Sequence, residues 1–371
     1  MRFNKNIGGF RGLAALSIVI LHVYNGPRDN GWFIIDGPAM SCVDFAISSL
    51  SAGVELFFMI SGYLISASLV KKADLRVFFA DRFFRIYPVF FLLNAVVFIV
   101  APFVNYHILA GVDALRYSAY FIDNSLMLCG VSQAPCAMEV SWSLSYELIF
   151  YIFSASVFAF AALRPGVSAT FSQRSVVSIV NILALLIGAA LIYRFPRGVF
   201  FFTGFLVFRY GESIAEKMPR VREYGVLLII PLLLTEEYAL RMGNSALAYP
   251  LYLTSFLISL PFFLAVVFGR GWQSNILRSN LAQYLGAISY SLYLCHPMIE
   301  YVLKRGIHHM AFAFSPFLQV MLLASLQIPI SIFVAHFSYK LIEGSLTGFL
   351  RRQFYASRKG GAAAAAVENV R

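Results

Sequence analysis

An arginine and a histidine stand eleven positions apart in an apolar stretch near the N-terminus, FRGLAALSIVILH. The residues between Arg11 and His22 carry no charge. On a helix, eleven residues rise about 16 Å in about three turns, so both side chains point to nearly the same face. A ligand lying along that face could place an anionic end at Arg11 and a reacting group at His22. The alternative is a positively charged anchor and a histidine that is hydrogen-bonded within the protein.

Two further arginines lie three positions apart in the stretch RVFFADRFFRIYP. Residues at i and i+3 share a helix face, so Arg82 and Arg85 would point the same way. Paired guanidinium groups bind phosphate well because each fork can donate two hydrogen bonds to it. The alternative is a cluster of positive charge at the cytoplasmic end of a helix.

Carboxylates occur inside two apolar segments. Glu55 lies in GVELFFMISGYLIS, in which Ser61-Gly62 allows close packing between helices, and Glu147 lies in EVSWSLSYELIFYI. We expect Glu147, with Glu55 as the second choice, to be the acid or base partner of a histidine on a neighbouring helix. The alternative is a packing motif and a carboxylate that reaches the membrane interface.

The segment around Glu147 carries further polar and interfacial groups. Trp142 is typical of a membrane interface, while Ser143 and Ser145 add hydroxyl groups to the outer turns of the expected helix. We expect Trp142 and Ser145 to contact the substrate.

The second candidate histidine lies late in the chain, in SYSLYLCHPMIE. Pro297 follows His296, and its missing N–H frees a carbonyl in the preceding turn, which suits a helix bent around a cavity. Tyr293, Ser61 and His296 are candidates to bind substrate and to stabilise an oxyanion. The alternative is a kinked helix whose histidine is structural.

The composition places these residues in a lipid bilayer. Of 371 residues, 60% are hydrophobic and 13% are charged, which is about half the charged fraction of a soluble domain. We therefore expect an all-α polytopic membrane protein with about ten spanning helices of roughly 20 apolar residues each. The expected spans are 11–26, 46–70, 83–104, 141–163, 176–194, 198–211, 223–240, 246–269, 282–303 and 313–342.

Charge predicts the orientation of these spans. With a cytoplasmic N-terminus and an even number of spans, 22 of the 29 Lys and Arg residues fall on the cytoplasmic side. The same bias explains the net charge of +11, so we expect no nucleic-acid partner. We expect residues 1–345 to form the membrane-embedded domain. Residues 346–371 would form a basic, partly disordered cytoplasmic tail.

The four cysteines show no metal-ligand spacing, and we expect no metal site. Cys129 and Cys136 lie in one polar loop that we place outside the cytoplasm. Either a disulfide or two free thiols would fit such a loop.

The candidate residues separate by depth under this topology. Arg11, Arg82 and Arg85 fall at the cytoplasmic face. The outer half of the membrane contains the candidate acid and base residues His22, Glu147 and His296. This pattern suits a phosphate-rich cytoplasmic donor with a long arm. Acyl-coenzyme A is such a molecule, with phosphates for the arginines and a thioester that can extend toward His22.

Five motifs, in this order along the chain, resemble the integral-membrane acyltransferase family 3. They are the Arg-x10-His of residues 11–22, GVELFFMISGYLI, RFFRIYP, WSLSYELIFY and SYSLYLCHP. The resemblance runs from about residue 6 to residue 343. Bacterial members of that family mostly O-acetylate cell-surface or secreted polysaccharides.

The resemblance implies a multi-pass enzyme of the bacterial inner (plasma) membrane. It implies acyl-CoA, with acetyl-CoA expected, as a cytoplasmic co-substrate rather than a bound cofactor. The implied acceptor is a carbohydrate on the periplasmic side, either a polysaccharide or a lipid-linked oligosaccharide. Arg11 and His22 match the family's essential pair, and Arg82 and Arg85 match its proposed donor-binding pair. Glu55 stands where many members carry aspartate.

The expected reaction moves an acyl group from the thioester to a sugar hydroxyl. His22 would act as general base or as covalent acyl carrier, with Glu147 or Glu55 orienting its imidazole. The main alternative is a polytopic transporter or flippase for polysaccharide or lipid-linked sugar, which would not consume a thioester. A sensor or scaffold for envelope synthesis would tolerate the loss of His22.

Overall fold

The computed structural model describes most of the chain. The described residues are 4–29, 31–32, 36–72, 74–162, 192–243, 245–310 and 315–356, together with 186, 188 and 190. Most of the expected span 176–194 and the last part of the expected tail, 357–371, lie outside the described residues.

The described chain is mainly helical and contains no strand, as the composition predicts. Its α-helices are α1 (Lys5–Asp29), α2 (Gly37–Ser48), α3 (Gly53–Lys72), α4 (Leu75–Val104), α5 (Ala114–Ser125), α6 (Trp142–Ala162), α8 (Phe200–Lys217), α9 (Pro219–Tyr224), α10 (Ile229–Met242), α11 (Ala248–Phe268), α12 (Trp272–Arg278), α13 (Asn280–Met310) and α14 (Pro316–Ser338). Short 3-10 turns are η1 (Ser49–Ala52), η2 (Glu139–Ser141), η3 (Pro196–Val199) and η4 (Gly225–Leu228), and η5 (Tyr339–Leu346) is a π-helix.

Five helical stretches of the described chain are long and apolar enough to cross a membrane. They are Lys5–Asp29, Gly37–Lys71, Leu75–Val104, Ala248–Phe268 and Phe317–Ala356. The fold is therefore that of an all-α polytopic membrane protein. The count of ten spans and the cytoplasmic position of both termini stay predictions.

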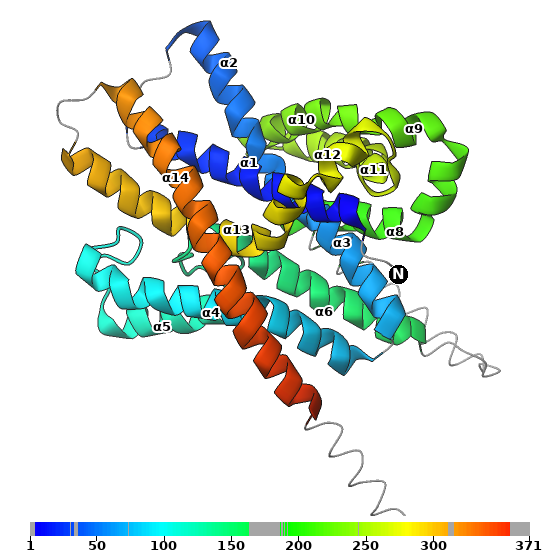
Figure 1. The fold of residues 1–371 in the computed structure, drawn as a ribbon, viewed down its shortest axis with the longest axis horizontal. Helices are drawn as coiled ribbons and strands as arrows, with labels where there is room; N and C mark the ends of the chain where they lie inside the picture. The colour runs from blue at the N-terminus through cyan, green and yellow to red at the C-terminus, as the bar shows by residue number, and fades with distance from the viewer. Residues whose placement is uncertain are drawn as a thin grey trace, which may run out of the picture.

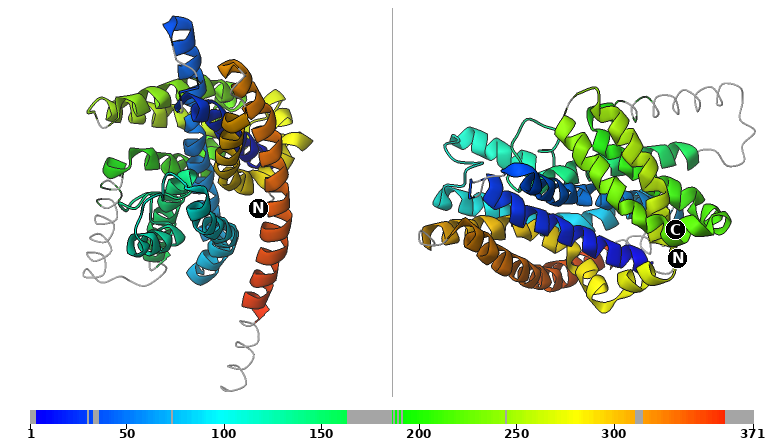
Figure 2. Two further views of the ribbon diagram at one scale, coloured as in Figure 1. Left: turned by 90° about the vertical axis from the view of Figure 1, so that its left-hand side faces the viewer. Right: turned by 90° about the horizontal axis from the view of Figure 1, so that it is seen from above.

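Helix α1 lies in the middle of the molecule. It packs along α13 and against α3, and α14 packs against α13 (Figure 1; Figure 2). Helices α4, α5 and α6 lie together on one side of these central helices, and α8 to α11 lie on the other (Figure 1). Arg11 and His22 are thus on a helix that packs against α3, α13 and α14.

The close packing expected at Ser61-Gly62 is present between α3 and α8. A Cβ added at Gly62 would lie 2.0 Å from the carbonyl oxygen of Phe201, which is too close for any side chain. The missing side chain lets the two backbones touch, and α3 thereby holds Glu55 and Ser61 at fixed positions in the bundle.

Local capping explains where the outer elements begin. Asp74 accepts hydrogen bonds from the backbone N–H groups of Arg76 and Val77, and α4 begins at the next residue. Asp113 accepts from the N–H groups of Leu115 and Arg116 in the same way at α5. Such N-caps satisfy backbone donors that have no partner inside the helix.

The loop expected at about 105–140 contains α5, which no apolar span predicted, and a disulfide. Cys129 and Cys136 are bonded, which decides between the two possibilities left open by the sequence. Ser145 at the start of α6 accepts a hydrogen bond from the Gly130 N–H at 3.0 Å and ties this loop to the bundle. Burial raises the pKa of the Tyr106 phenol in this loop above its usual value.

The first part of the expected tail is helical. Residues 347–356 continue from η5 as a helix. Arg351 and Tyr355 reach the carboxylate of Asp81 on α4, at 3.5 Å and 3.1 Å. This stretch therefore packs on the same helix that carries Arg82 and Arg85.

Candidate active site

Three cavities follow one another along α1. The inner cavity, of about 760 Å³, is lined by Arg11. The middle cavity, of about 70 Å³, also reaches Arg11 and shares Leu64, Arg82 and Arg85 with the inner one. The outer cavity, of about 810 Å³, contains His22 and shares no lining residue with the other two. The two ends of the Arg-x10-His pair therefore face different spaces.

The inner cavity is positively charged. The cations on its wall are Arg11, Lys71, Arg82 and Arg85, against one carboxylate, Glu343. The structure thus brings together the three arginines that the sequence singles out and adds Lys71. This arrangement suits an anion with several phosphate oxygens.

Arg82 is held in place by its neighbours. Its Nη2 donates to the carbonyl oxygen of Leu64 at 3.3 Å. Its guanidinium also lies 5.7 Å from the ring centres of both Phe78 and Tyr151, within the range of cation–π attraction. Arg85 is more exposed and has freedom to follow a ligand.

His22 is paired with a carboxylate that the sequence analysis did not single out. Nδ1 of His22 lies 3.2 Å from Oε2 of Glu300 on α13, and Oε1 of Glu300 lies 3.0 Å from Nζ of Lys304. Because a carboxylate accepts, Nδ1 carries the ring proton and Nε2 is left with the lone pair. The geometry leaves Nε2 to take a proton or an acyl group.

His296 lies beside this pair. Its ring is 4.7 Å from the ring of His22, nearly perpendicular to it. Nδ1 of His296 lies 3.0 Å from the carbonyl oxygen of Leu292 and must donate to it, so Nε2 carries the lone pair when the ring is neutral. Among the described residues that buried Nε2 has no hydrogen-bond partner. A neutral His296 can therefore accept a hydrogen bond, but it cannot donate one to an oxyanion.

The expected pairing of Glu147 with His22 is wrong. Glu147 lines the middle cavity and accepts hydrogen bonds from Ser61, at 3.0 Å, and from Tyr151. Helix α6 begins at Trp142, so Glu147 lies about 7 Å further along its axis. Glu147 therefore shares the middle cavity with Arg11 and does not line the cavity that contains His22.

Glu55 does not orient His22 either. Its fully buried carboxylate is bonded to Nε of Arg197, which precedes α8. The Arg197 guanidinium also lies 4.5 Å from the ring centre of Trp142. Glu55, Arg197 and Trp142 therefore join α3, η3 and α6, and they line none of the three cavities.

The remaining candidates occupy two kinds of place. Ser61 and Tyr293 line the middle cavity. Trp142 and Ser145 do not line the three cavities. The Trp142 ring packs against the guanidinium of Arg197, and the Ser145 hydroxyl accepts a hydrogen bond from the Gly130 N–H.

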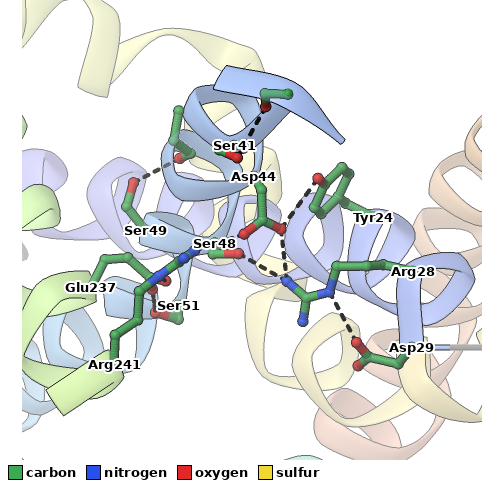
Figure 3. Close-up of polar contacts among 12 residues, drawn as sticks. Tyr24, Arg28, Asp29, Ser41, Asp44, Ser48, Ser49, Ser51, Glu237 and Arg241 are labelled. Carbon is green, nitrogen blue, oxygen red and sulfur yellow. Dashed lines mark hydrogen bonds and ion pairs between the residues drawn. The ribbon is translucent and has the colours of Figure 1, made fainter. Parts of the chain in front are cut away.

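A network of ion pairs closes the outer end of α1 (Figure 3). Asp44 on α2 accepts from Arg28 at 2.9 Å and from Arg241 at 2.8 Å, and Arg241 also pairs with Glu237 at 2.6 Å. Tyr24 donates to the same Asp44 at 3.3 Å. The network fixes α2 and α10 against the turn of α1 that follows His22.

One signal in the sequence could have identified Glu300. It stands four positions after His296 in the same apolar stretch, so the two side chains share a helix face. Lys304 follows four positions later on that face and completes the row. Arg197 and Lys71 have no comparable signal, because each lies among other basic residues at a helix end.

Most of the chain matches the model of a known protein family. The family model of acyltransferase family 3, described as an acyltransferase domain, matches residues 4–336. The chain belongs to this family. The matched residues include all three cavities except Tyr339 and Glu343, which lie beyond them. The acyltransferase therefore carries its candidate site within the family's shared domain.

Curated relatives of this acyltransferase share a modest fraction of residues with it. Nodulation protein 10 of Rhizobium leguminosarum bv. viciae is 26% identical over 40% of this chain and 42% of its own length. The peptidoglycan O-acetyltransferase OatA of Listeria monocytogenes serovar 1/2a is 27% identical over 41% of the chain and 23% of its own length.

A longer match is a Staphylococcus aureus protein (strain MSSA476) whose name marks it as a provisional O-acetyltransferase. It is 25% identical over 92% of this chain and 57% of its own length. The acyltransferase thus spans between about a quarter and about three fifths of the length of these three relatives. No solved structure is significantly similar to it.

Proposed function

We propose that this protein is an O-acyltransferase of a bacterial inner membrane. It would move an acyl group, acetyl in the first place, from cytoplasmic acyl-CoA to a sugar hydroxyl of a cell-surface or exported polysaccharide. The observation that carries the proposal is the placement of two different chemistries on one helix. Arg11 lies at an inner space rich in cations, and His22 lies at an outer space beside Glu300.

The inner cavity would hold the donor. Its cations match the phosphates of coenzyme A, and the neighbouring middle cavity offers the apolar walls that a pantetheine arm prefers. About 16 Å separate the levels of Arg11 and His22 along α1. An extended arm can span that length and carry its thioester toward the histidine.

The outer cavity would hold the acceptor. Its wall combines the aromatic side chains Trp32 and Tyr301 with donors and acceptors such as Asn25, Asn105 and Glu139. A volume of about 810 Å³ lies within the usual range of ligand sites. Such a mixture of ring faces and hydrogen-bonding groups suits a sugar better than an apolar ligand.

His22 would act as the general base. Its Nε2 takes the proton of the sugar hydroxyl while the oxygen attacks the thioester carbonyl. Glu300 stabilises the imidazolium that forms, because a negative charge beside Nδ1 favours the protonated ring. The carbon–sulfur bond then breaks, and the imidazolium returns the proton to the coenzyme A thiolate. In the covalent alternative, Nε2 itself takes the acyl group from the thioester and then passes it to the sugar hydroxyl.

The test is transfer of label by protein purified in detergent. Wild type, His22→Gln and His336→Gln would each be incubated with radiolabelled acetyl-CoA and host envelope glycan. His336, on α14, is the matched control, because it packs against Tyr284 of α13 and lines none of the three cavities. We expect labelled glycan from wild type and from His336→Gln, and a loss of at least about 10²-fold in His22→Gln.

Two outcomes would contradict the proposal. If His22→Gln labels glycan as fast as wild type, His22 has no part in the chemistry. If wild type consumes neither acetyl-CoA nor succinyl-CoA, the protein is no acyl-CoA-dependent enzyme, and the transporter becomes the better account.

A further inference from the structure

We infer that Asn25 donates the hydrogen bond that stabilises the oxyanion formed during acyl transfer at His22. The inference rests on the proposed function and adds a catalytic residue to it. The charge that develops on the thioester carbonyl oxygen needs an N–H or O–H donor, and such donors are often the largest single contribution to the rate of acyl transfer. None of the candidates from the sequence, Ser61, Tyr293 and His296, lines the outer cavity.

The protons of these three candidates are also in use. Ser61 donates to a carboxylate at 3.0 Å, and the Tyr293 hydroxyl donates to a backbone carbonyl oxygen at 3.1 Å. Each of these hydroxyl groups has one proton. A neutral His296 carries its ring proton on Nδ1, which donates to another backbone carbonyl oxygen at 3.0 Å. The oxyanion donor therefore has to come from the wall of the outer cavity itself.

Asn25 lies on the same face of α1 as His22. The two residues are three positions apart on the helix, a spacing that places Cβ atoms about 5–6 Å apart. Both residues line the outer cavity. When a sugar hydroxyl at Nε2 of His22 attacks a thioester, the carbonyl oxygen lies two bonds from the attacking oxygen. An amide at this separation from the base can reach it.

The amide of Asn25 presents its N–H group to the cavity. Its Oδ1 is buried and has no hydrogen-bond partner among the described residues. Because the oxygen is turned into the protein, Nδ2 is the amide atom at the cavity wall, and no described residue accepts from it. A buried polar atom without a partner is costly and calls for an explanation. An N–H donor that is kept free for the substrate provides one.

The backbone around Asn25 is held on both sides. The hydroxyl of the preceding residue, Tyr24, donates to Asp44 of α2 at 3.3 Å. The following residue, Gly26, lets α1 approach α13 so closely that an added Cβ would overlap the carboxylate of Glu300. A donor whose position is fixed before the reaction stabilises developing charge without having to reorganise.

The cations of the same wall are held by other contacts. Nζ of Lys304 lies 3.0 Å from the carboxylate of Glu300, which faces the Nδ1 side of His22. Nη1 of Arg305 donates to a backbone carbonyl oxygen at 2.6 Å. These contacts tie both cations to the protein, whereas the N–H group of Asn25 is free for the substrate.

The hydrogen bond acts on the oxygen that gains charge. The sugar oxygen bonds to the carbonyl carbon while Nε2 of His22 takes the hydroxyl proton. The π electrons of the C=O bond move to the carbonyl oxygen, which accepts from Nδ2 of Asn25. When the carbon–sulfur bond breaks, these electrons re-form the C=O bond, and the leaving thiolate receives the proton from the imidazolium. The hydrogen bond is strongest when the charge is greatest, so it lowers the barrier.

Steady-state kinetics of Asn25→Ala and Asn25→Asp test the inference. The assay follows radiolabel from acetyl-CoA into host envelope glycan, with rates normalised to folded, monodisperse protein in detergent. Both variants lack the N–H donor. We expect kcat to fall by about 10²–10³-fold in both, while KM for glycan and for acetyl-CoA changes less than about threefold.

Two further variants complete the design. Asn25→Gln keeps an N–H donor and should retain more activity than Asn25→Asp, which has nearly the size of the native side chain and keeps the test decisive if Asn25→Ala does not fold. Asn94→Ala is the matched control. Asn94 also has a buried Oδ1 without a partner among the described residues, but it lies on α4 and lines none of the three cavities. It should keep kcat within about twofold.

The outcomes separate this inference from the proposed function. If Asn25→Ala and Asn25→Asp transfer label with the kcat of wild type, the inference is overturned. A higher KM for glycan at unchanged kcat also overturns it, because Asn25 then binds the acceptor without acting on the transition state. Both results leave the proposed function standing. If wild type transfers no label from acetyl-CoA or succinyl-CoA, the proposed function fails and the inference fails with it.

Discussion

Nδ1 of His22 lies 3.2 Å from the carboxylate of Glu300, although 278 positions separate the two residues in the chain. The contact joins the central helix α1 to α13 at the wall of the outer cavity. It leaves Nε2 of His22 to react and places a negative charge where an imidazolium would form. The packing of α1 along α13 brings these two side chains together.

Replacing Glu300 by glutamine should lower the rate of transfer far more than it weakens donor binding. The amide cannot stabilise a positive imidazole, so we expect kcat to fall by about 10²-fold or more while KM for acyl-CoA changes less than about threefold. Glu300→Asp should recover part of the lost rate. Steady-state kinetics on the purified variants measure both parameters.

The control for Glu300 is another buried carboxylate with the same kind of partner. Glu237 pairs with Arg241 at i+4, as Glu300 pairs with Lys304, but it lies on α10 away from His22. Glu237→Gln should keep kcat within about twofold. An equal loss in both variants would mean that Glu300 acts only through the stability of the bundle.

Gly26→Ala should disturb the same contact from the other side. A Cβ at this position would lie 2.0 Å from Oε1 of Glu300, so the carboxylate must shift from its position beside His22 and Lys304. We expect a loss of kcat close to that of Glu300→Gln, and little further loss when the two changes are combined. Gly306→Ala on α13 meets no atom within 4 Å and is the control. Additive losses in the double variant would show that Gly26 acts elsewhere.

Arg85→Gln should weaken the donor without harming the chemistry. Arg85 lines both the inner and the middle cavity, and loss of a charged hydrogen bond to phosphate should raise Kd for coenzyme A about tenfold. Arg76→Gln, at an exposed position near the start of α4, should leave Kd unchanged. Equilibrium binding of radiolabelled coenzyme A compares them, and equal affinity in all three proteins would remove Arg85 from the donor site.

Asp44→Ala should lower the stability of the outer end of the bundle. Its buried carboxylate accepts from Arg28 and Arg241, and its loss leaves two guanidinium groups without that partner, at a cost of about 1–3 kcal/mol. Asp36→Ala, at the exposed start of α2, should have no such effect. Thermal unfolding in detergent should show a lower Tm for Asp44→Ala alone; matching Tm values would mean that the network carries no net stability.

Local patterns in the sequence predicted much of the fold. Long apolar runs identified α1, α4 and α11, because such runs must lie in lipid or in the core. They did not identify α5, which has one polar and one apolar face, or α12, which is short. A long apolar run indicates a helix that crosses the membrane, whereas α5 and α12 lie in the segments between such runs.

Spacing in the sequence predicted which candidate residues share a helix, but not which of them meet across helices. Arg11 and His22 lie on α1, and Arg82 and Arg85 lie on α4, so spacing alone relates the members of each pair. The choice of Glu147 for His22 was wrong, because the depth of a residue along one helix does not tell which residue of another helix it meets. Glu300 is fixed by the packing of α1 on α13, which no single motif contains.

We propose that the donor enters at the arginines and the acceptor at His22, on opposite sides of one membrane. Sealed vesicles test it most directly, with radiolabelled acetyl-CoA added only to the outer solution and with glycan present on both sides. Inverted vesicles, which expose the cytoplasmic face, should label glycan, whereas right-side-out vesicles should label it only after they are made permeable. Equal labelling by intact vesicles of both orientations would contradict the account.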